Sequence, residues 1–340
     1  MIKERGKLKD GKNSFENGLR EVWETDDGVI VVELGHDFSK PVRAFLLPET
    51  DGYVLVDTGY AETAEQLLSA IKPYRITKIV LTHLHIDHAG GVALLKTKMK
   101  TPLFYHRNES IALRYAQRAD EWFPIVFNEE DVPALRDALK FLRNFPTPDG
   151  FLDENVLKSW VVIETPGHTP GHVVFSNGRE AVIGDLILSD DTSNVAYVPI
   201  PGYRPLSSYL SSVVKVAKLH VNRFLPSHGL LFETCRNRVK EIFAHHYERL
   251  SQTAAALNEG LKTPTDVATR IKWSKGSYYS LPPVEKWLAL LETLSHLDFL
   301  AETGYAVNES TFVYKVSENP DWKRVMQFME KLASNFWSSS

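Results

Sequence analysis

Short runs of β-branched and aromatic residues alternate with helical stretches between residue 29 and about residue 230. The runs are bounded by Gly, Pro, Asp or Asn, which is typical of strands. We predict strands at Val29–Leu34, Val42–Leu47, Tyr53–Asp57, Lys78–Thr82, Leu103–Tyr105, Trp160–Glu164, Val173–Ser176, Ala181–Asp185 and Arg223–Pro226. Helical periodicity is present at Glu62–Ile71, Val92–Lys98 and Leu206–Ala217. This alternation predicts a layered α/β domain with sheets inside and helices outside.

Residues 107–150 interrupt the alternation and predict a helical insertion. Apolar residues at helical spacing indicate two helices, one around Ile111 and one from about Leu135 to Leu142. Three aromatic residues lie between them: Trp122, Phe123 and Phe127. Such an insertion can cover a substrate pocket as a lid, and it can equally be packing at the edge of the fold.

The pattern becomes mostly helical after about residue 235. We predict helices at Glu241–Asn258, Pro264–Ile271 and Val284–Glu302, followed by a hairpin of Tyr305–Val307 and Phe312–Val316. Three helices and a hairpin predict a winged-helix-like domain over residues 236–318, after a catalytic domain over residues 1–235. Residues 319–340 form a tail, in which Trp322–Phe336 predicts an amphipathic helix. Its apolar stripe can dock on the same chain or on a second copy, as in a homodimer.

Composition narrows the class of protein. The 340 residues are 43% hydrophobic and 24% charged, with a net charge of −4, which indicates a globular protein and argues against nucleic acid or anionic membrane as the main partner. Cys235 is the single cysteine, so we expect it to be a buried small side chain. The start of the chain lacks the apolar core of a secretory signal, and no apolar run is long enough to span a membrane. We therefore expect a cytoplasmic protein with no membrane contact.

Histidines gather at one predicted strand end. The run Thr82-His83-Leu84-His85-Ile86-Asp87-His88 follows the apolar residues of a strand and precedes two glycines and a helix. Side chains at a strand's carboxyl end converge above the sheet. Three imidazoles and a carboxylate in so short a run supply the N and O ligands that zinc prefers. The run therefore predicts a metal site.

Three further strand ends carry an acid or a histidine. One is Glu164-Thr165-Pro166-Gly167-His168-Thr169-Pro170-Gly171-His172, another is Ile183-Gly184-Asp185, and the third is Pro226-Ser227-His228-Gly229. We expect these segments to meet in one site. The other histidines are expected to be surface or packing residues: His36, His106, His220, His245, His246 and His296.

These motifs make the chain resemble the metallo-β-lactamase superfamily over about residues 28–235. The matching positions are Asp57 in Asp57-Thr58-Gly59, the run His83–His88, His168, Asp185 and His228. The paired Pro-Gly-His form resembles the glyoxalase II, lactonase and LACTB2-like branch more than true β-lactamases, and the helical tail resembles that of LACTB2-like proteins. The resemblance implies a four-layer αββα sandwich with a small-molecule substrate.

The resemblance also implies two zinc ions, with iron or manganese suited to the same ligands. It assigns His83, His85 and His168 to one metal, Asp87, His88 and His228 to the other, and Asp185 to both. The residues expected to orient these ligands without contacting metal are Asp57, Thr169 and His172. Asp87 and Asp185 are the expected catalytic residues, with Asp87 helping to hold the attacking water.

A site of this kind implies hydrolysis by a metal-bridging hydroxide. The first hypothesis is a hydrolase of a carboxylic derivative, meaning a thioester, lactone or ester, active on more than one of them. The alternative is a single-strand endoribonuclease or phosphodiesterase of the LACTB2-like type, against which the near-neutral charge of the helical tail counts. A third hypothesis is a regulatory protein with a relict site. Tyr197 and Tyr203 can stabilise an oxyanion or simply pack, and with the three insertion aromatics they are the expected substrate contacts.

Overall fold

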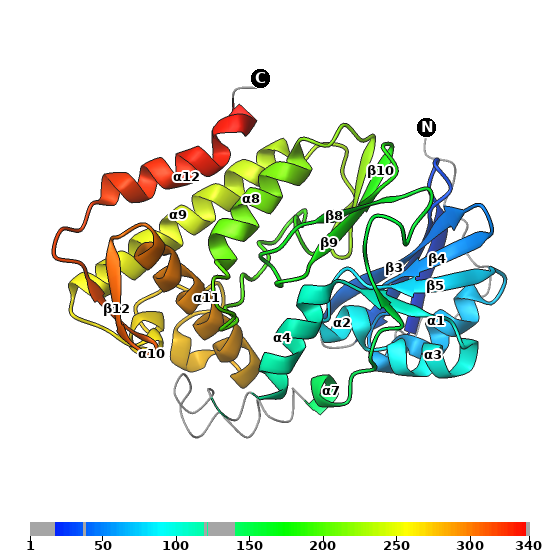
Figure 1. The fold of residues 1–340 in the computed structure, drawn as a ribbon, viewed down its shortest axis with the longest axis horizontal. Helices are drawn as coiled ribbons and strands as arrows, with labels where there is room; N and C mark the ends of the chain where they lie inside the picture. The colour runs from blue at the N-terminus through cyan, green and yellow to red at the C-terminus, as the bar shows by residue number, and fades with distance from the viewer. Residues whose placement is uncertain (1–17, 37–38, 119–120, 122–139, 338–340) are drawn as a thin grey trace.

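Two β-sheets lie face to face between layers of helices in this computed structural model, which describes residues 18–36, 39–118, 121 and 140–337 (Figure 1). The first sheet contains, in spatial order, β1 (Gly18–Glu24), β2 (Ile30–His36), β3 (Ser39–Glu49), β4 (Gly52–Val56), β5 (Ile76–Val80), β6 (Leu103–Tyr105) and β7 (Gly150–Phe151). Strands β1 to β4 pair antiparallel, and β4 to β7 pair parallel. The second sheet has the order β11 (Arg223–Pro226), β10 (Glu180–Gly184), β9 (Val173–Ser176) and β8 (Val161–Glu164).

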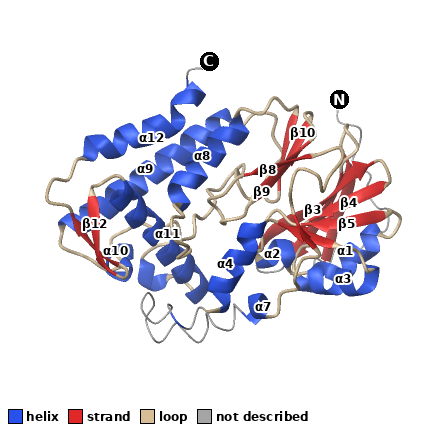
Figure 2. Ribbon diagram, viewed as in Figure 1, coloured by secondary structure: helices blue, strands red, loops and turns tan. Residues whose placement is uncertain are grey.

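Helices cover the outer faces of both sheets (Figure 2). In the sandwich they are α1 (Ala64–Ile71), α2 (Ile86–Ala89), α3 (Val92–Met99), α4 (Arg107–Gln117), α7 (Lys140–Arg143) and α8 (Pro205–Ala217). The C-terminal region holds α9 (Arg236–Asn258), α10 (Pro264–Ala268), α11 (Pro283–Glu302), the antiparallel pair β12 (Ala306–Ser310) and β13 (Val313–Val316), and α12 (Trp322–Trp337). Single 3₁₀ turns lie at Ala61–Thr63 and Tyr278–Ser280. No helix in these described parts is long and apolar enough to cross a membrane.

Strand alternation divides the interior into three cores. Val31 on β2 belongs to the core between the sheets, together with Phe175 of β9, whereas its neighbour Val32 belongs to the outer core, together with Leu67 of α1. Successive side chains on a strand point to opposite faces, so each sheet buries both of its faces. On the second sheet the outer face packs against α8, α9 and α11. This arrangement confirms the predicted αββα sandwich.

The nine predicted strands are all present, with ends displaced by at most three residues. The sequence pattern missed β1, which is an edge strand with a half-exposed face, and β7, which has only two residues. The first strand of the predicted hairpin ends at Val307, but β12 extends through Ser310 and the chain turns after it. Phe312 in that turn adopts a positive φ of 59° and is buried. Trp122, Phe123 and Phe127 lie outside the described residues.

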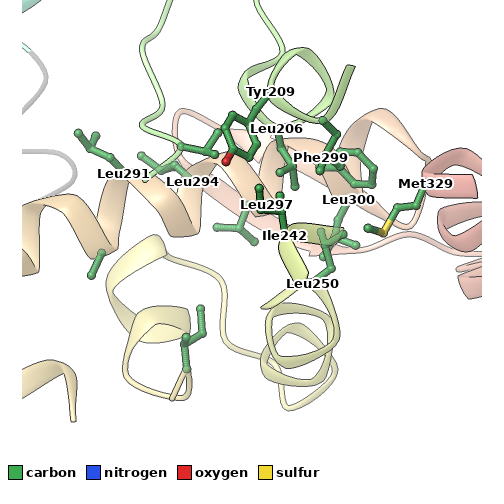
Figure 3. Close-up of a cluster of buried hydrophobic side chains, with 14 of the residues drawn as sticks. Leu206, Tyr209, Ile242, Leu250, Leu291, Leu294, Leu297, Phe299, Leu300 and Met329 are labelled. Carbon is green, nitrogen blue, oxygen red and sulfur yellow. The ribbon is translucent and has the colours of Figure 1, made fainter. Parts of the chain in front are cut away.

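One apolar core joins the C-terminal helices to the second sheet. Figure 3 shows side chains of α8, α9, α11 and α12 directed toward one another, among them Tyr209, Ile242, Leu297 and Met329. The terminal helix is present as predicted, and its apolar stripe packs within the chain on this core. Cys235 also belongs to the core and is buried, which confirms the expectation. The boundaries at residues 235 and 318 and the winged-helix likeness stay predictions.

Candidate metal centre

The predicted ligands meet at one edge of the sandwich, where strands of both sheets end. β5 ends at Val80, the loop after it carries His83 and His85, and α2 then begins at Ile86. The close approach of this segment to the loop after β4 requires Gly91, because a Cβ at that position would lie 2.5 Å from the Thr58 carbonyl oxygen. Asp185 and His228 follow the ends of β10 and β11, and His168 lies in the turn between β8 and β9.

The structure arranges the seven side chains in two groups. Ligand atoms of His83, His85 and His168 lie within 4.8 Å of one another, as do those of Asp87, His88, Asp185 and His228. Asp185 lies between the groups, since its Oδ2 is 3.8 Å from His168 Nε2 in the first and 3.7 Å from His228 Nε2 in the second. The two groups correspond to the division that the resemblance implies, and the roles of these residues as metal ligands and of Asp185 as a bridge stay predictions.

Hydrogen bonds outside the centre set the direction of the imidazoles. His168 Nδ1 donates to the Asn194 carbonyl at 2.8 Å, and His228 Nδ1 donates to the Pro41 carbonyl at 2.7 Å. A neutral imidazole that donates from Nδ1 keeps a lone pair on Nε2. His85 is turned the other way, with its Nδ1 3.0 Å from His168 Nε2. Nε2 of His168, Nε2 of His228 and Nδ1 of His85 therefore face the centre and are the candidate ligand atoms of these three rings.

Asp57 orients two further imidazoles from a strained backbone. Its φ is +60°, outside the ordinary range for a residue with a Cβ, and its carboxylate is fully buried. It accepts from His88 Nδ1 at 2.8 Å and from the Thr82 hydroxyl at 2.8 Å. Since the Thr82 hydroxyl donates to Asp57, it accepts from His83 Nδ1 at 2.9 Å. Asp57 thus directs Nε2 of both histidines inward, the arrangement by which outer carboxylates orient metal ligands.

His172 and Thr169 lie just outside the ligands. His172 Nε2 accepts the backbone N–H of Asp185 at 3.2 Å, and its Nδ1 is paired with the Thr165 hydroxyl at 2.8 Å. Both ring nitrogens are therefore in use, and His172 supports the main chain of Asp185. The Thr169 hydroxyl donates to Glu109.

Burial and charge set the protonation states of the centre. Burial lowers the pKa of His85 to about 3 and that of His83 well below its ordinary value, so both rings are neutral at pH 7. Burial acts to raise the pKa of Asp87, but His88 and His228 outweigh it and lower the pKa to about 2. Burial acts to lower the pKa of His88, but the carboxylates around it raise the pKa well above its ordinary value. Cation binding at His88 would therefore compete with a proton.

The donor set fits divalent cations. Within the described part of the chain, His83 Nε2, His88 Nε2 and Asp185 Oδ1 are buried without a hydrogen-bond partner. A buried polar atom left unsatisfied costs about 1–3 kcal/mol. Asp57, Asp87 and Asp185 also bring three carboxylates into one poorly solvated region. Cations at the two groups would satisfy the orphaned atoms and balance this charge.

Sequence reasoning missed Glu109, which ties the two loops of the first group together. Its buried carboxylate accepts the Leu84 N–H at 2.9 Å, the Thr169 hydroxyl at 2.6 Å and the Gly171 N–H at 2.7 Å. Burial raises its pKa. Its three partners come from two distant loops, so no local spacing marked it.

Arg43 was also missed. Its guanidinium donates to the carbonyls of Pro226 and Gly229 at 3.2 and 2.6 Å, on either side of His228. It is paired with Glu33 at 2.8 Å. Arg43 thereby holds the loop of the last ligand against the first sheet.

The two candidate tyrosines lie in different surroundings. The Tyr203 hydroxyl donates to the Gly167 carbonyl at 3.3 Å, so it supports the loop that leads to His168. The Tyr197 ring packs edge-on against Phe312, with ring centroids 5.9 Å apart. The roles of Tyr203 and Tyr197 in substrate binding stay predictions.

A four-layer sandwich with a His/Asp centre at the edge of its two sheets defines a metal-dependent hydrolase. The chain belongs to the metallo-β-lactamase superfamily, whose sequence pattern matches residues 40–228. Among curated relatives, the probable metallo-hydrolase YflN of Bacillus subtilis is 26% identical over 54% of this chain and 77% of its own length. The probable metallo-hydrolase YqjP of the same organism is 24% identical over 81% of this chain and 93% of its own.

A solved structure shares the fold over most of the chain. The β-lactamase domain protein from Burkholderia ambifaria has a TM-score of 0.72 and 23% identity, covering 87% of this chain and 94% of that one.

Two other relatives carry more specific names. The atrochrysone carboxyl ACP thioesterase of Aspergillus fumigatus is 26% identical over 60% of this chain and 56% of its own length. A β-lactamase-like protein 2 homolog of Caenorhabditis elegans is 25% identical over 67% of this chain and 70% of its own.

Proposed function

We propose that this chain is a hydrolase with two zinc ions per chain that acts on a carboxylic derivative: a thioester, a lactone or an ester. The observation that carries the proposal is the position of Asp185 between two complete groups of N and O ligands. Iron or manganese would suit the same donor atoms. Similarity to a protein named as a thioesterase supports the choice of substrate class.

The residues of the centre have separable roles in this proposal. When bound, two divalent cations supply an acidified water and a Lewis acid for the substrate oxygen. His83, His85 and His168 would hold one cation, Asp87, His88 and His228 would hold the other, and Asp185 would serve both. His88 and His228 lower the pKa of Asp87 despite burial, so its carboxylate is ionised at neutral pH and can hold the attacking water as a hydrogen-bond acceptor. Asp57, Thr169 and His172 keep these groups in place.

A phosphodiester or single-stranded RNA is the second candidate substrate. Similarity to β-lactamase-like protein 2 homologs favours it. The C-terminal region supplies little positive charge for a nucleic-acid backbone, which counts against it. We therefore propose a small molecule as the main partner. A cytoplasmic location, a winged-helix-like region and a homodimer remain sequence predictions, and the apolar stripe that suggested the homodimer is used within the chain by α12.

A matched hydrolysis panel on zinc-loaded protein tests the proposal, with Asp185→Ala as the blank. The panel holds an acyl-glutathione thioester, an acyl-homoserine lactone, a chromogenic β-lactam, a phosphodiester and a single-stranded RNA. Turnover of the thioester or lactone well above the others, and lost in the blank, supports the carboxylic-derivative assignment. Cleavage of RNA alone, again lost in the blank, overturns it in favour of the second candidate.

A further inference from the structure

Helix α11 of the C-terminal region lies against a loop that supports the metal centre. The loop follows Asp185 and runs along the helix over residues 194–197. The Tyr197 N–H donates to the Leu291 carbonyl at 3.2 Å. The Ser295 hydroxyl donates to the Val195 carbonyl at 2.7 Å. These bonds join the main chain of the loop directly to α11, so the helix sets the path of the loop.

Asn194 in this loop contacts the metal centre and the helix at once. Its carbonyl accepts His168 Nδ1 at 2.8 Å, the bond that turns Nε2 of this ligand inward. Its side-chain Nδ2 donates to Glu292 Oε2 at 3.0 Å and to the Leu288 carbonyl at 3.2 Å, both on α11. A displacement of Asn194 would therefore change the orientation of the His168 ring.

Glu292 is a buried, ionised acceptor for the Asn194 amide. Its carboxylate lies 3.3 Å from Arg249 Nε and 3.6 Å from His245 Nε2, both on α9. Burial acts to raise the pKa of Glu292, but His245 and Arg249 outweigh it and lower the pKa to about 2. An ionised carboxylate only accepts hydrogen bonds, so it fixes the amide with Nδ2 toward α11.

We propose that Glu292 is a positioning residue for the metal centre, which holds the ring of His168 in its ligand orientation through Asn194. The C-terminal helices are then part of the metal site and not only a separate module. The inference rests on the proposed function, because it needs His168 to be a metal ligand. Glu292 should therefore affect zinc binding at the first group, which contains His168. It should not affect the second group, because the ring Nδ1 atoms of His88 and His228 bond to other partners than Asn194.

A neighbouring acid on the same helix provides the matched control. Glu302 accepts a hydrogen bond from the Ser207 hydroxyl of α8, so it also joins α11 to another helix. It has no contact with Asn194 among the described hydrogen bonds. Glu302→Gln therefore makes the same loss of charge at a comparable interhelical contact and leaves the proposed chain of bonds intact.

The test is a zinc titration of the metal-free full-length protein against a competing chelator. Histidine ring ¹⁵N NMR identifies which group each zinc occupies, and a thermal melt of each variant reports stability. We expect Glu292→Gln to weaken zinc binding at the group of His83, His85 and His168 by roughly tenfold, with the group of Asp87, His88 and His228 unchanged. Glu302→Gln should leave both affinities unchanged.

Asn194→Ala removes the hydrogen bond between Asn194 and Glu292 by changing the donor. It keeps the Glu292–Arg249 pair and the main-chain carbonyl of residue 194. It provides the readout if Glu292→Gln does not fold. The double variant should lose no more affinity than either single variant, because both remove one link. Additive losses, equal losses at both groups that follow the melting temperature, or an unchanged affinity would each overturn the inference. Failure of the unmodified protein to bind zinc would instead overturn the proposed function, and the inference with it.

Discussion

The Glu109→Gln substitution tests how much one buried carboxylate contributes to the metal centre. Glu109 lies on α4 and is 2% exposed. Its three donors are the N–H of Leu84, between His83 and His85, and two groups that follow His168. All of them belong to loops of the first ligand group. We therefore expect Glu109→Gln to weaken that group and to leave the second one unchanged.

The magnitude follows from the donors that the amide cannot satisfy. The amide oxygen can replace Oε1 and keep the bonds from Thr169 and Gly171. The amide NH₂ then faces the Leu84 N–H, so two buried donors lack an acceptor, at about 1–3 kcal/mol each. Removal of a buried charge offsets part of this, since burial raises the pKa of Glu109. We expect a net loss of about 2–4 kcal/mol in unfolding free energy and of roughly 10–100-fold in zinc affinity at the first group.

Glu49→Gln is the matched control for this variant. Glu49 also accepts two backbone N–H groups and a hydroxyl, from Lys158 and Ser159. It lies at the β3–β4 turn, whereas the metal centre follows the opposite end of β4. Urea unfolding and zinc competition should show a loss of about 1 kcal/mol or less and unchanged zinc affinity for Glu49→Gln. Equal zinc affinities for Glu109→Gln and the unmodified protein would refute the reasoning.

Three further predictions concern the centre and the C-terminal core. Asp185→Ala should lose both metals and all hydrolysis while keeping its circular dichroism spectrum, and a variant that still binds two metals by elemental analysis would contradict the bridging position. Burial lowers the pKa of His296 from 6.5 to about 4. Between these two pKa values the unfolded chain binds a proton on His296 that the folded chain does not. The free energy of unfolding should therefore fall by about 3 kcal/mol as the pH drops from above the first value to below the second. His296→Gln should flatten that pH profile in urea titrations, and an equally steep profile would exclude this residue as the cause. Leu297→Ala should lower the unfolding free energy by about 2–5 kcal/mol, because Leu297 is fully buried; a loss below 1 kcal/mol would show that the core collapses around the cavity.

The local pattern of the sequence was sufficient to predict most of the secondary-structure elements and to identify the candidate ligands. Each central strand carries apolar residues on both faces and is bounded by turn residues, so its existence does not depend on distant contacts. The candidate ligands lie in a short run or directly after such strands, and parallel strand ends meet at one edge. The pattern failed for β1, which has one half-exposed face, and it was ambiguous for the stripe of α12, which suited a second copy as well as this chain.

The sequence by itself therefore determined the strands, the candidate ligands and, through its motifs, the resemblance to the family and its sandwich. Only the tertiary structure decided what holds the centre in place. Glu109 bonds to residues 25 to 62 positions away, and Asn194 bonds to Glu292 at a separation of 98. Such carboxylates have no periodic or motif signature, because their partners are set by how the loops and α11 pack. A carboxylate that packing removes from water needs hydrogen-bond donors from the protein. The tertiary structure shows which distant residues supply these donors.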